Sequence, residues 1–402
     1  MTDADEFQYR RDLLVILGAG ASHDCLADQP ADVFMPPLTK DLATRNDVST
    51  SLLESYGAAI PILDFLVERL EYGPEATDGI KSTSLEVLLA EYISQASSNP
   101  NKSQHVTAFR FYLRDLIAGA QNSVLVEGGR KNRFDTLMRE CAEWAVANNA
   151  KACFVSFNYD TLLEIAFSHY FNSSLHSESS YLANRHVNVL KPHGSITWSY
   201  VRADCTIDDG DLDRDSMERR IFDESVRLGE PFVTDSSRKW LDQRMAAESI
   251  KLGEPAAAEV ADLRIFSDIV SYVPAESDIH RHYHPVLPAI ALPVAEKDEL
   301  IWPASQDNYF RETIHNGSFG KVIFIGWRGA ETHFVPLLDR LVANDGNVLY
   351  VTGGSSPDAH AQSIADLQDN LRFLVNRTRA HVYYEGFATL TRSEAFDTFL
   401  RL

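Results

Sequence analysis

Four short apolar runs in the chain predict strands that are buried on both faces of a sheet. The runs are DLLVILG (12–18), ACFVSFN (152–158), KVIFIG (321–326) and NVLYVTGG (347–354). Their apolar residues are continuous rather than alternating, which is typical of parallel strands covered by helices on both sides. Each run ends in Gly or Asn, where a loop begins. We therefore expect a ligand-binding crevice just beyond the ends of these strands.

Apolar residues at helical spacing occupy the long stretch between the first two runs. The three sets are Ile62, Phe65, Leu66 and Leu70; Leu85, Leu88, Leu89 and Tyr92; and Phe109, Tyr112, Leu113 and Leu116. Spacings of three and four residues put each set on one face of a helix. The spacing predicts a large helical insertion over 40–150.

A second insertion is predicted over 201–280, where 19 acidic and 10 basic residues are concentrated. We expect it to be partly helical. It is either a contact for a partner or a solvated excursion of the chain. Both insertions are expected to belong to one enlarged domain that spans residues 1–402.

Composition narrows the class of function. The chain has 37 basic and 58 acidic residues and a net charge of −21. This charge repels phosphate backbones, so direct binding of nucleic acid is disfavoured. No run of eighteen uncharged apolar residues occurs, and the N-terminus is acidic and polar, so we expect neither a membrane span nor a signal peptide. The scattered cysteines form no C-x-x-C pair, which argues against a disulfide framework or a four-cysteine zinc site and favours a cytoplasmic location; they are Cys25, Cys141, Cys153 and Cys205.

Three loops after apolar runs carry candidate chemistry. GAGAS (18–22) is either a phosphate-binding loop or a structural tight turn. It lacks the third glycine of the dinucleotide fingerprint, because position 23 is His. Asn158 and Asp160 are two residues apart, so they either face one ligand together or Asp160 caps the following helix. His193 lies between Pro192 and Gly194 and is either a general base or a hydrogen-bonded surface residue.

A histidine cluster, HRHYH, is a further candidate. His280, His282 and His284 alternate, so on a strand they would share one side and, with a carboxylate such as Asp278, bind a transition metal. The alternative is a polar loop near the cleft.

The motifs occur in the order GAGAS, PPLT (36–39), NYD (158–160), HG (193–194) and GWRGAETH (326–333). This order resembles the sirtuin superfamily. It is most similar to the sirtuin-like NADases of bacterial antiphage defence, where a glycine loop and P-L-T precede N-Y-D, H-G and G-Y-S-x-x-D. The resemblance covers 12–60, 150–200 and 285–390 and leaves most of the helical stretch and the acidic insertion outside.

The resemblance implies a Rossmann-like α/β fold, with a parallel sheet between helices, and it implies a role for each matching residue. Asn158 would position the attacking water, Asp160 would help to orient the nicotinamide, and His193 would be the catalytic base. The loop residues that would contact the NAD diphosphate and the adjoining ribose are Gly18, Ala19, Gly20 and Ser22.

The same resemblance places the other end of the dinucleotide at the later motifs. Gly326 and Glu331 would contact ribose and phosphate, and Gly353 and Gly354 would lie near the adenosine. Arg328 stands where Ser is common, and Thr352 with Gly353 replaces a more usual Asn. We therefore expect the adenosine end to be recognised differently.

The function implied is hydrolysis of NAD+ to nicotinamide and ADP-ribose, with NAD as substrate and no metal required. Such an enzyme would deplete NAD in abortive infection, as a homo-oligomer and with a HerA-type hexameric ATPase as a possible partner. The first alternative is an NAD-dependent deacylase or ADP-ribosyltransferase. The missing zinc ribbon argues against a deacylase. The second is a non-catalytic sensor of NAD or ADP-ribose.

Overall fold

The protein is described from a computed structural model. The structure describes residues 12–26, 33–38, 42, 47–72, 85–96, 99–128, 132–202, 206–208, 212–228, 261–270, 272–274, 282–294, 301, 303–316, 319–329, 331, 334–353, 364–365, 367 and 369–402. The chain forms two compact units. Unit 1 comprises Met1–Leu38, Ala118–Gly194 and Ile301–Leu402, and unit 2 comprises Thr39–Ile117 and Ser195–Leu300.

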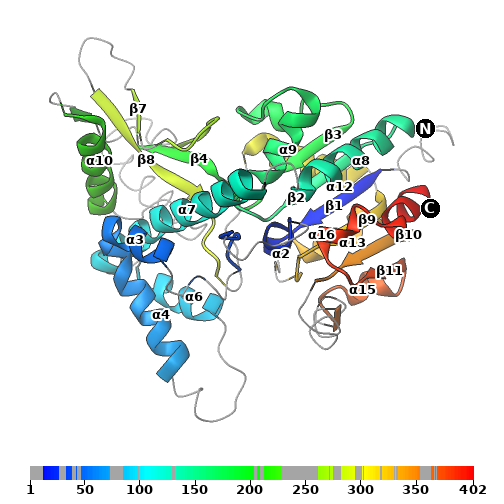
Figure 1. Cartoon of the computed structure of the whole chain (residues 1–402), viewed down its shortest axis with the longest axis horizontal. Coiled ribbons are helices and arrows are strands. Elements are labelled where there is room, and N and C mark those ends of the chain that lie inside the picture. The colour runs from blue at the N-terminus through cyan, green and yellow to red at the C-terminus, as the bar shows by residue number, and fades with distance from the viewer. Residues whose placement is uncertain are drawn as a thin grey trace, which may run out of the picture. The chain divides into compact units, whose positions relative to one another are not determined.

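Unit 1 is built on a six-stranded sheet in the order β11-β10-β9-β1-β2-β3 (Figure 1). The strands are β1 (Leu13–Leu17), β2 (Ala152–Ser156), β3 (Val187–Leu190), β9 (Phe319–Ile325), β10 (Val342–Val351) and β11 (Arg379–Tyr383). Every neighbouring pair is parallel. Counted along the chain, the order is 6-5-4-1-2-3, which is the Rossmann order read from the opposite edge. The order reverses between β1 and β9, so this is the topological switch point of the sheet.

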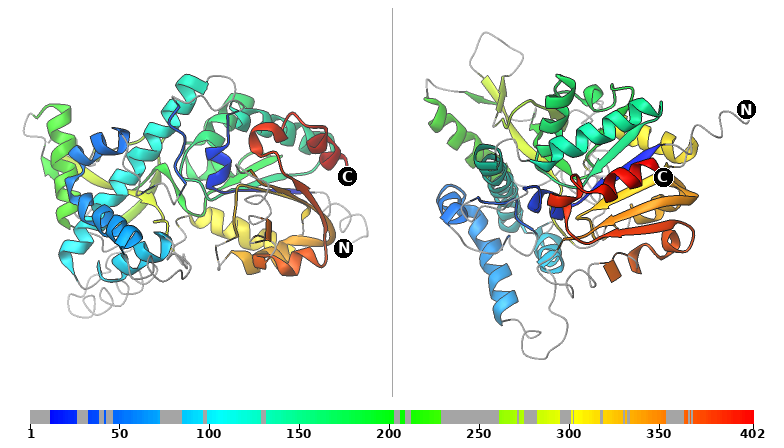
Figure 2. Two further views of the ribbon diagram at one scale, coloured as in Figure 1. Left: turned by 60° about the horizontal axis from the view of Figure 1, so that its bottom comes forward. Right: turned by 45° about the vertical axis from the view of Figure 1, so that its right-hand side comes forward.

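Helices cover both faces of this sheet (Figure 2). One face packs its alternate strand residues, among them Ile16 and Phe324, against α12 (Ala304–Asn316), α13 (Val335–Leu341) and α15 (Arg372–Val375). The other face carries Lys321 of β9, which donates to the Leu400 carbonyl of α17 (Glu394–Arg401) and lies over the Trp144 ring of α8 (Arg133–Ala147). Unit 1 is therefore a Rossmann-like α/β unit, as the apolar runs predict.

The remaining elements of unit 1 are short or connect the strands. They are α2 (Ala19–His23), α9 (Leu162–Phe171), η5 (Glu178–Tyr181) and α16 (Phe387–Leu390). Helix α2 follows β1 directly, and α9 follows β2. GAGAS therefore lies at the carboxyl end of β1, with Gly18 as the N-cap of α2 and its other residues in that helix, and NYD lies in the loop after β2.

Unit 2 combines helices with a second sheet, in which β4 and β6, β5 and β8, and β7 and β8 pair antiparallel. Its sheet has the order β5-β8-β4-β6, and β7 pairs with β8. These strands are β4 (Gly194–Arg202), β5 (Ile207–Asp208), β6 (Ala261–Ile265), β7 (Tyr272–Pro274) and β8 (His282–Ile290). The helices are α3 (Asp47–Ser55), η2 (Gly57–Ala59), α4 (Ile60–Tyr72), α6 (Leu85–Ser94), the first part of α7 (Pro100–Gly128) and α10 (Arg214–Leu228).

The stretch predicted to be helical over 40–150 is mostly helical in its described residues, and it contributes to both units. Helices α3, α4 and α6 belong to unit 2, α7 continues from unit 2 into unit 1, and α8 belongs to unit 1. The acidic stretch 201–280 contributes α10, β6 and β7, while residues 229–260 lie outside the described part of the chain.

The described helices were compared with the length and hydropathy that a membrane span requires. No single helix among them is long and apolar enough, and one bent pair, Val48–Ser55 with Gly57–Leu70, meets the length and composition alone.

Candidate functional site

Two glycine loops meet at the switch point of the unit 1 sheet. The Gly18 amide donates to the Ile325 carbonyl at 3.0 Å, and the Gly20 amide donates to the Gly326 carbonyl at 3.1 Å. Gly326 has φ +60°, and a Cβ there would lie 2.2 Å from the Ala21 nitrogen. These glycines are therefore required by the close approach of two backbones. Ala19 is the exposed residue of the GAGAS loop, and the Gly20 amide is already engaged.

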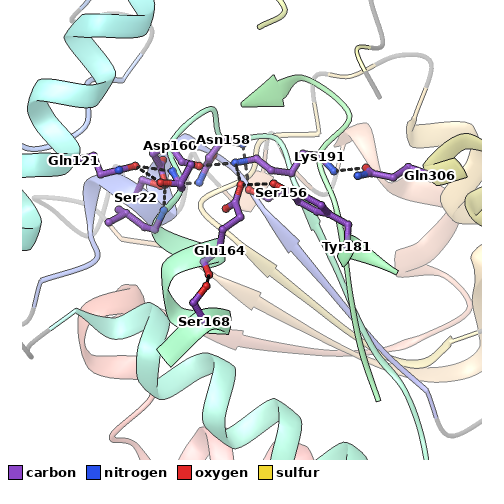
Figure 3. Close-up of polar contacts among 12 residues, drawn as sticks. Ser22, Gln121, Ser156, Asn158, Asp160, Glu164, Ser168, Tyr181, Lys191 and Gln306 are labelled. Carbon is purple, nitrogen blue, oxygen red and sulfur yellow. Dashed lines mark hydrogen bonds and ion pairs between the residues drawn. The ribbon is translucent and has the colours of Figure 1, made fainter. Parts of the chain in front are cut away.

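The side chains of Ser22, Asn158 and Asp160 form a buried hydrogen-bond network (Figure 3). The Ser22 hydroxyl donates to Asp160 Oδ2 at 2.6 Å, and Asn158 Nδ2 donates to Ser22 Oγ at 2.8 Å. Their exposed fractions are 1%, 5% and 5% in sequence order. The structure thus brings together residues from the ends of β1 and β2. The Ser22 side chain is engaged here, so the expected diphosphate contact would fall to its backbone.

Asp160 is not the N-cap of α9, because that position is Thr161, which makes no side-chain cap bond. Asp160 precedes it: its Oδ2 accepts from Ser22, while its Oδ1 accepts from the Leu162 amide at 3.1 Å, at the first residue of α9. One carboxyl group therefore holds both Ser22 and the first amide of the helix, and its contact with a ligand stays a prediction. The next residue, Thr161, is held separately, because its amide and its hydroxyl both donate to Gln121 of α7.

Asn158 keeps one polar atom for a ligand. Its Nδ2 is used by Ser22, and its amide donates to the Ser156 hydroxyl at 3.3 Å. Its Oδ1 is buried and has no hydrogen-bond partner among the described residues. A buried carbonyl oxygen without a partner is costly, so this atom fits a hydroxyl or water donor.

His193 lies beside the same loop. Its side chain is fully buried, so it is not the surface residue of the alternative interpretation. Its ring packs edge-on against Phe157 at 4.9 Å and lies 6.3 Å from the ring of Tyr159, the two residues that flank Asn158. The turn is fixed by a bond from the Gly194 amide to the Lys191 carbonyl and by one from the Ile301 amide to the Pro192 carbonyl. Asn158, Asp160 and His193 therefore all lie just beyond the carboxyl ends of two neighbouring strands, β2 and β3.

A buried ion pair beneath these residues was not anticipated from the sequence. Lys191 Nζ lies 2.7 Å from Glu164 Oε1, and it also donates to the backbone carbonyl of Asp160. Tyr181 donates to the same Glu164 oxygen at 3.3 Å. Burial raises the pKa of the Glu164 carboxyl, and Lys191 opposes that shift. The available signal was one charged residue inside each of two apolar segments, LLEIAF and VLKP.

The residues expected at the adenosine end lie at the ends of β9 and β10, which are in register through Ile325 and Val351. Glu331 is buried, and its carbonyl accepts from the Phe334 and Val335 amides at the start of α13. Gly353 is exposed, and a Cβ there would lie 3.3 Å from Asp24 Oδ2. Gly354 lies outside the described residues.

Asp24 is a second residue that the sequence did not single out. Its Oδ2 accepts from the Phe387 amide at 2.6 Å and from the Ala388 amide at 3.3 Å, at the start of α16. Burial raises the pKa of this carboxyl, and the two backbone bonds oppose the shift. Asp24 therefore joins the segment after α2 to the segment after β11.

The histidine cluster is only partly described. His284 lies on β8, the side chain of His282 and the whole of His280 lie outside the described residues, and so does Asp278. Within the described part of the chain, no group of three His, Cys, Asp or Glu side chains is placed to hold a metal ion.

No protein-family model and no curated protein sequence matches the chain. The fold and the site together define its class. It contains a Rossmann-like α/β unit with a buried Ser-Asn-Asp network and a buried histidine beyond the carboxyl ends of the central strands.

Proposed function

We propose that the protein hydrolyses NAD+ to nicotinamide and ADP-ribose. The observation that carries the proposal is the buried Oδ1 of Asn158, which has no partner among the described residues, at the strand ends where a Rossmann sheet binds nucleotides. The buried ring of His193 packs against Phe157, the residue before Asn158. In the reaction the bond between ribose C1′ and the nicotinamide nitrogen breaks. The oxygen of water forms the new bond to C1′, and one proton is released.

Each residue of the site has a different role in the proposed reaction, set by its polar atoms. Asn158 Oδ1 accepts a hydrogen bond from the attacking water and so orients its lone pair. His193 accepts the proton that the water gives up. The transition state carries positive charge on the ribose, so fixed oxygens nearby stabilise it without reorganising. Asp160 and Ser22 hold Asn158 in place.

The sheet supports one direction for the bound dinucleotide. Asn158 and His193 follow β2 and β3, and Gly326 and Gly353 follow β9 and β10 on the other side of the switch point. With the nicotinamide half over the first pair, the adenosine half falls over the second, and the diphosphate crosses the loop at Gly18.

The test is incubation of the purified protein with NAD+, followed by chromatography of the products. The parent protein is expected to release nicotinamide and free ADP-ribose in equal amounts. Asn158→Ala and His193→Ala are expected to lower the rate at least about 100-fold. Asn148→Ala and His169→Ala, which change the exposed residue after α8 and an exposed residue of α9, are matched controls expected to stay within about threefold of the parent.

Other products would select another function. ADP-ribose attached to a macromolecule, or consumption of NAD+ that requires an acylated peptide, would indicate the transferase or the deacylase. A nucleotide that is bound and recovered unchanged would indicate a sensor.

The resemblance also supplies the biological setting that we propose. NAD depletion would stop a phage-infected cell, so the activity must be held in check, by self-association or by a HerA-type ATPase partner. The same assay, run with and without that ATPase, measures such control.

A further inference from the structure

Lys191 contributes to two separate parts of the site. Its main chain belongs to the His193 turn, where its carbonyl accepts from the Gly194 amide and its amide donates to Gln306 Oε1 at 3.0 Å. Its side chain leaves that turn and ends at the backbone carbonyl of Asp160 (Figure 3). One residue therefore joins the His193 turn to the loop that carries Asn158.

This contact lies beyond the ladder that pairs β2 with β3. The last residue pair of the ladder is Val155 with Leu190, immediately before Lys191. The two loops that follow carry the site and lie beyond the last residue pair that joins β2 to β3. The Lys191 ammonium continues the connection through a bond from side chain to main chain.

The charge of Lys191 is balanced within the same network. Its side chain is fully buried, and Glu164 supplies the opposite charge at 2.7 Å. A buried pair of this kind costs desolvation that an apolar pair of similar volume would avoid. The pair also places little net charge beneath a transition state that is itself positive. The burial of Lys191 is therefore better explained by a role in positioning the two loops than by a contribution to stability.

We propose that Lys191 is a positioning residue, which holds the Asn158–Asp160 loop in register with His193 through the Asp160 carbonyl. The inference rests on the proposed hydrolysis of NAD+ for its catalytic readout. Its structural readout, the order of the loop, is independent of that activity.

The test compares the parent with Lys191→Met/Glu164→Gln, which removes both charges and keeps an acceptor for Tyr181. The double variant is expected to lose about 100-fold in kcat for NAD+, with KM within about threefold, because small misplacements of reacting groups cost that much. Amide hydrogen exchange over residues 157–161 is expected to be at least about tenfold faster. The melting temperature should stay near that of the parent.

The matched control is a substitution of another buried cationic side chain that is paired with a carboxylate. Arg114 of unit 2 lies 2.6 Å from Asp115, and Arg114→Met should lower the melting temperature while kcat and exchange over 157–161 stay unchanged. If the double variant does not fold, Lys191→Arg replaces it. A guanidinium keeps the charge but cannot place its donors at the same point, so the same loss in kcat is expected.

The outcomes separate the two proposals. Unchanged kcat, or unchanged exchange over 157–161, in the folded variant overturns the role of Lys191. If the parent itself does not cleave NAD+, the proposed function fails, and hydrogen exchange alone decides whether Lys191 orders the loop.

Discussion

The hydrogen atoms around Ser22 can be arranged in one way when Asp160 is ionised. A carboxylate only accepts, so the Ser22 proton goes to Asp160 Oδ2. Ser22 Oγ must then accept from Asn158, which assigns the nitrogen of the amide to Ser22 and leaves the oxygen for a ligand. The serine at position 22 thus determines which atom of the Asn158 amide has no partner among the described residues.

Removal of the Lys191 charge should make stability depend on pH. Burial raises the pKa of Glu164, and Lys191 opposes this, so Lys191→Met raises that pKa further. A carboxyl with a raised pKa in the folded state gives stability that is fully present below its unfolded pKa and is lost as pH rises through its folded pKa. We expect the free energy of unfolding of Lys191→Met, relative to the parent, to fall as pH rises above the ordinary pKa of a glutamate carboxyl.

Urea unfolding at a series of pH values measures this difference. The control is Lys191→Met/Glu164→Gln, which has no carboxyl at position 164, so its difference from the parent should vary less with pH. Parallel curves for Lys191→Met and the parent would show that removal of Lys191 does not raise the pKa of Glu164 in the folded protein.

At the scale of elements, the contact between the loops after β1 and β9 should tolerate no side chain. A Cβ at Gly326 would lie 2.6 Å from the Gly20 Cα, and its φ of +60° disfavours any other residue. We expect Gly326→Ala to lower the free energy of unfolding by about 3 kcal/mol or more, through forced separation of the two loops. Chemical denaturation measures the change.

Gly57→Ala is the matched control. Gly57 begins η2 in unit 2, and a Cβ there meets nothing within 4 Å. Alanine at this position should be neutral or slightly stabilising. Equal losses from both substitutions would mean that the loop contact at the switch point does not constrain the fold.

The same elements show what the sequence could predict of the fold. The four continuous apolar runs are β1, β2, β9 and β10, because a strand buried on both faces has few polar positions. The strand β11 (RAHVY) lacks a continuous apolar run, because it is an exposed edge strand, and it was therefore not predicted. The strand β10 begins five residues earlier than its apolar run, across Asp345 at φ 63°, where the register shifts. Such irregular starts leave no periodic signal.

The site was predictable where chemistry follows directly after a strand. Asn158, Asp160 and His193 all follow apolar runs, and the parallel order of β2 and β3 brings them together. The partners of these residues are tertiary contacts across long separations. Ser22 and Asp160 are 138 residues apart in sequence, and Lys191 and Glu164 are 27 apart. No local spacing in the sequence therefore predicts either pair.

At the scale of the molecule, the candidate site belongs to unit 1, although its residues are spread from Gly18 to Gly353. Two segments of unit 2, Thr39–Ile117 and Ser195–Leu300, interrupt unit 1 in sequence. The strand ends therefore stay adjacent in the sheet, although more than a hundred residues separate GAGAS from NYD and HG from GWRGAETH. Short motifs in a fixed order remain readable across such insertions, whereas a continuous fingerprint does not.

Self-association is the last prediction, and it concerns the helices of the stretch 40–150. Several large apolar side chains of this stretch remain exposed in the structure, namely Val48, Leu70, Val87, Val126 and Val146. Val126 is 81% exposed and Val87 is 46% exposed. Apolar helix surface of this kind commonly meets another subunit.

We expect a homo-oligomer at micromolar concentration, and Val87→Glu with Val126→Glu should shift it toward the monomer. Leu212→Glu, an exposed apolar residue outside the stretch, is the matched control. Light scattering measures the mass, and a single 45.0 kDa species with full NAD+ cleavage would rule out control by self-association.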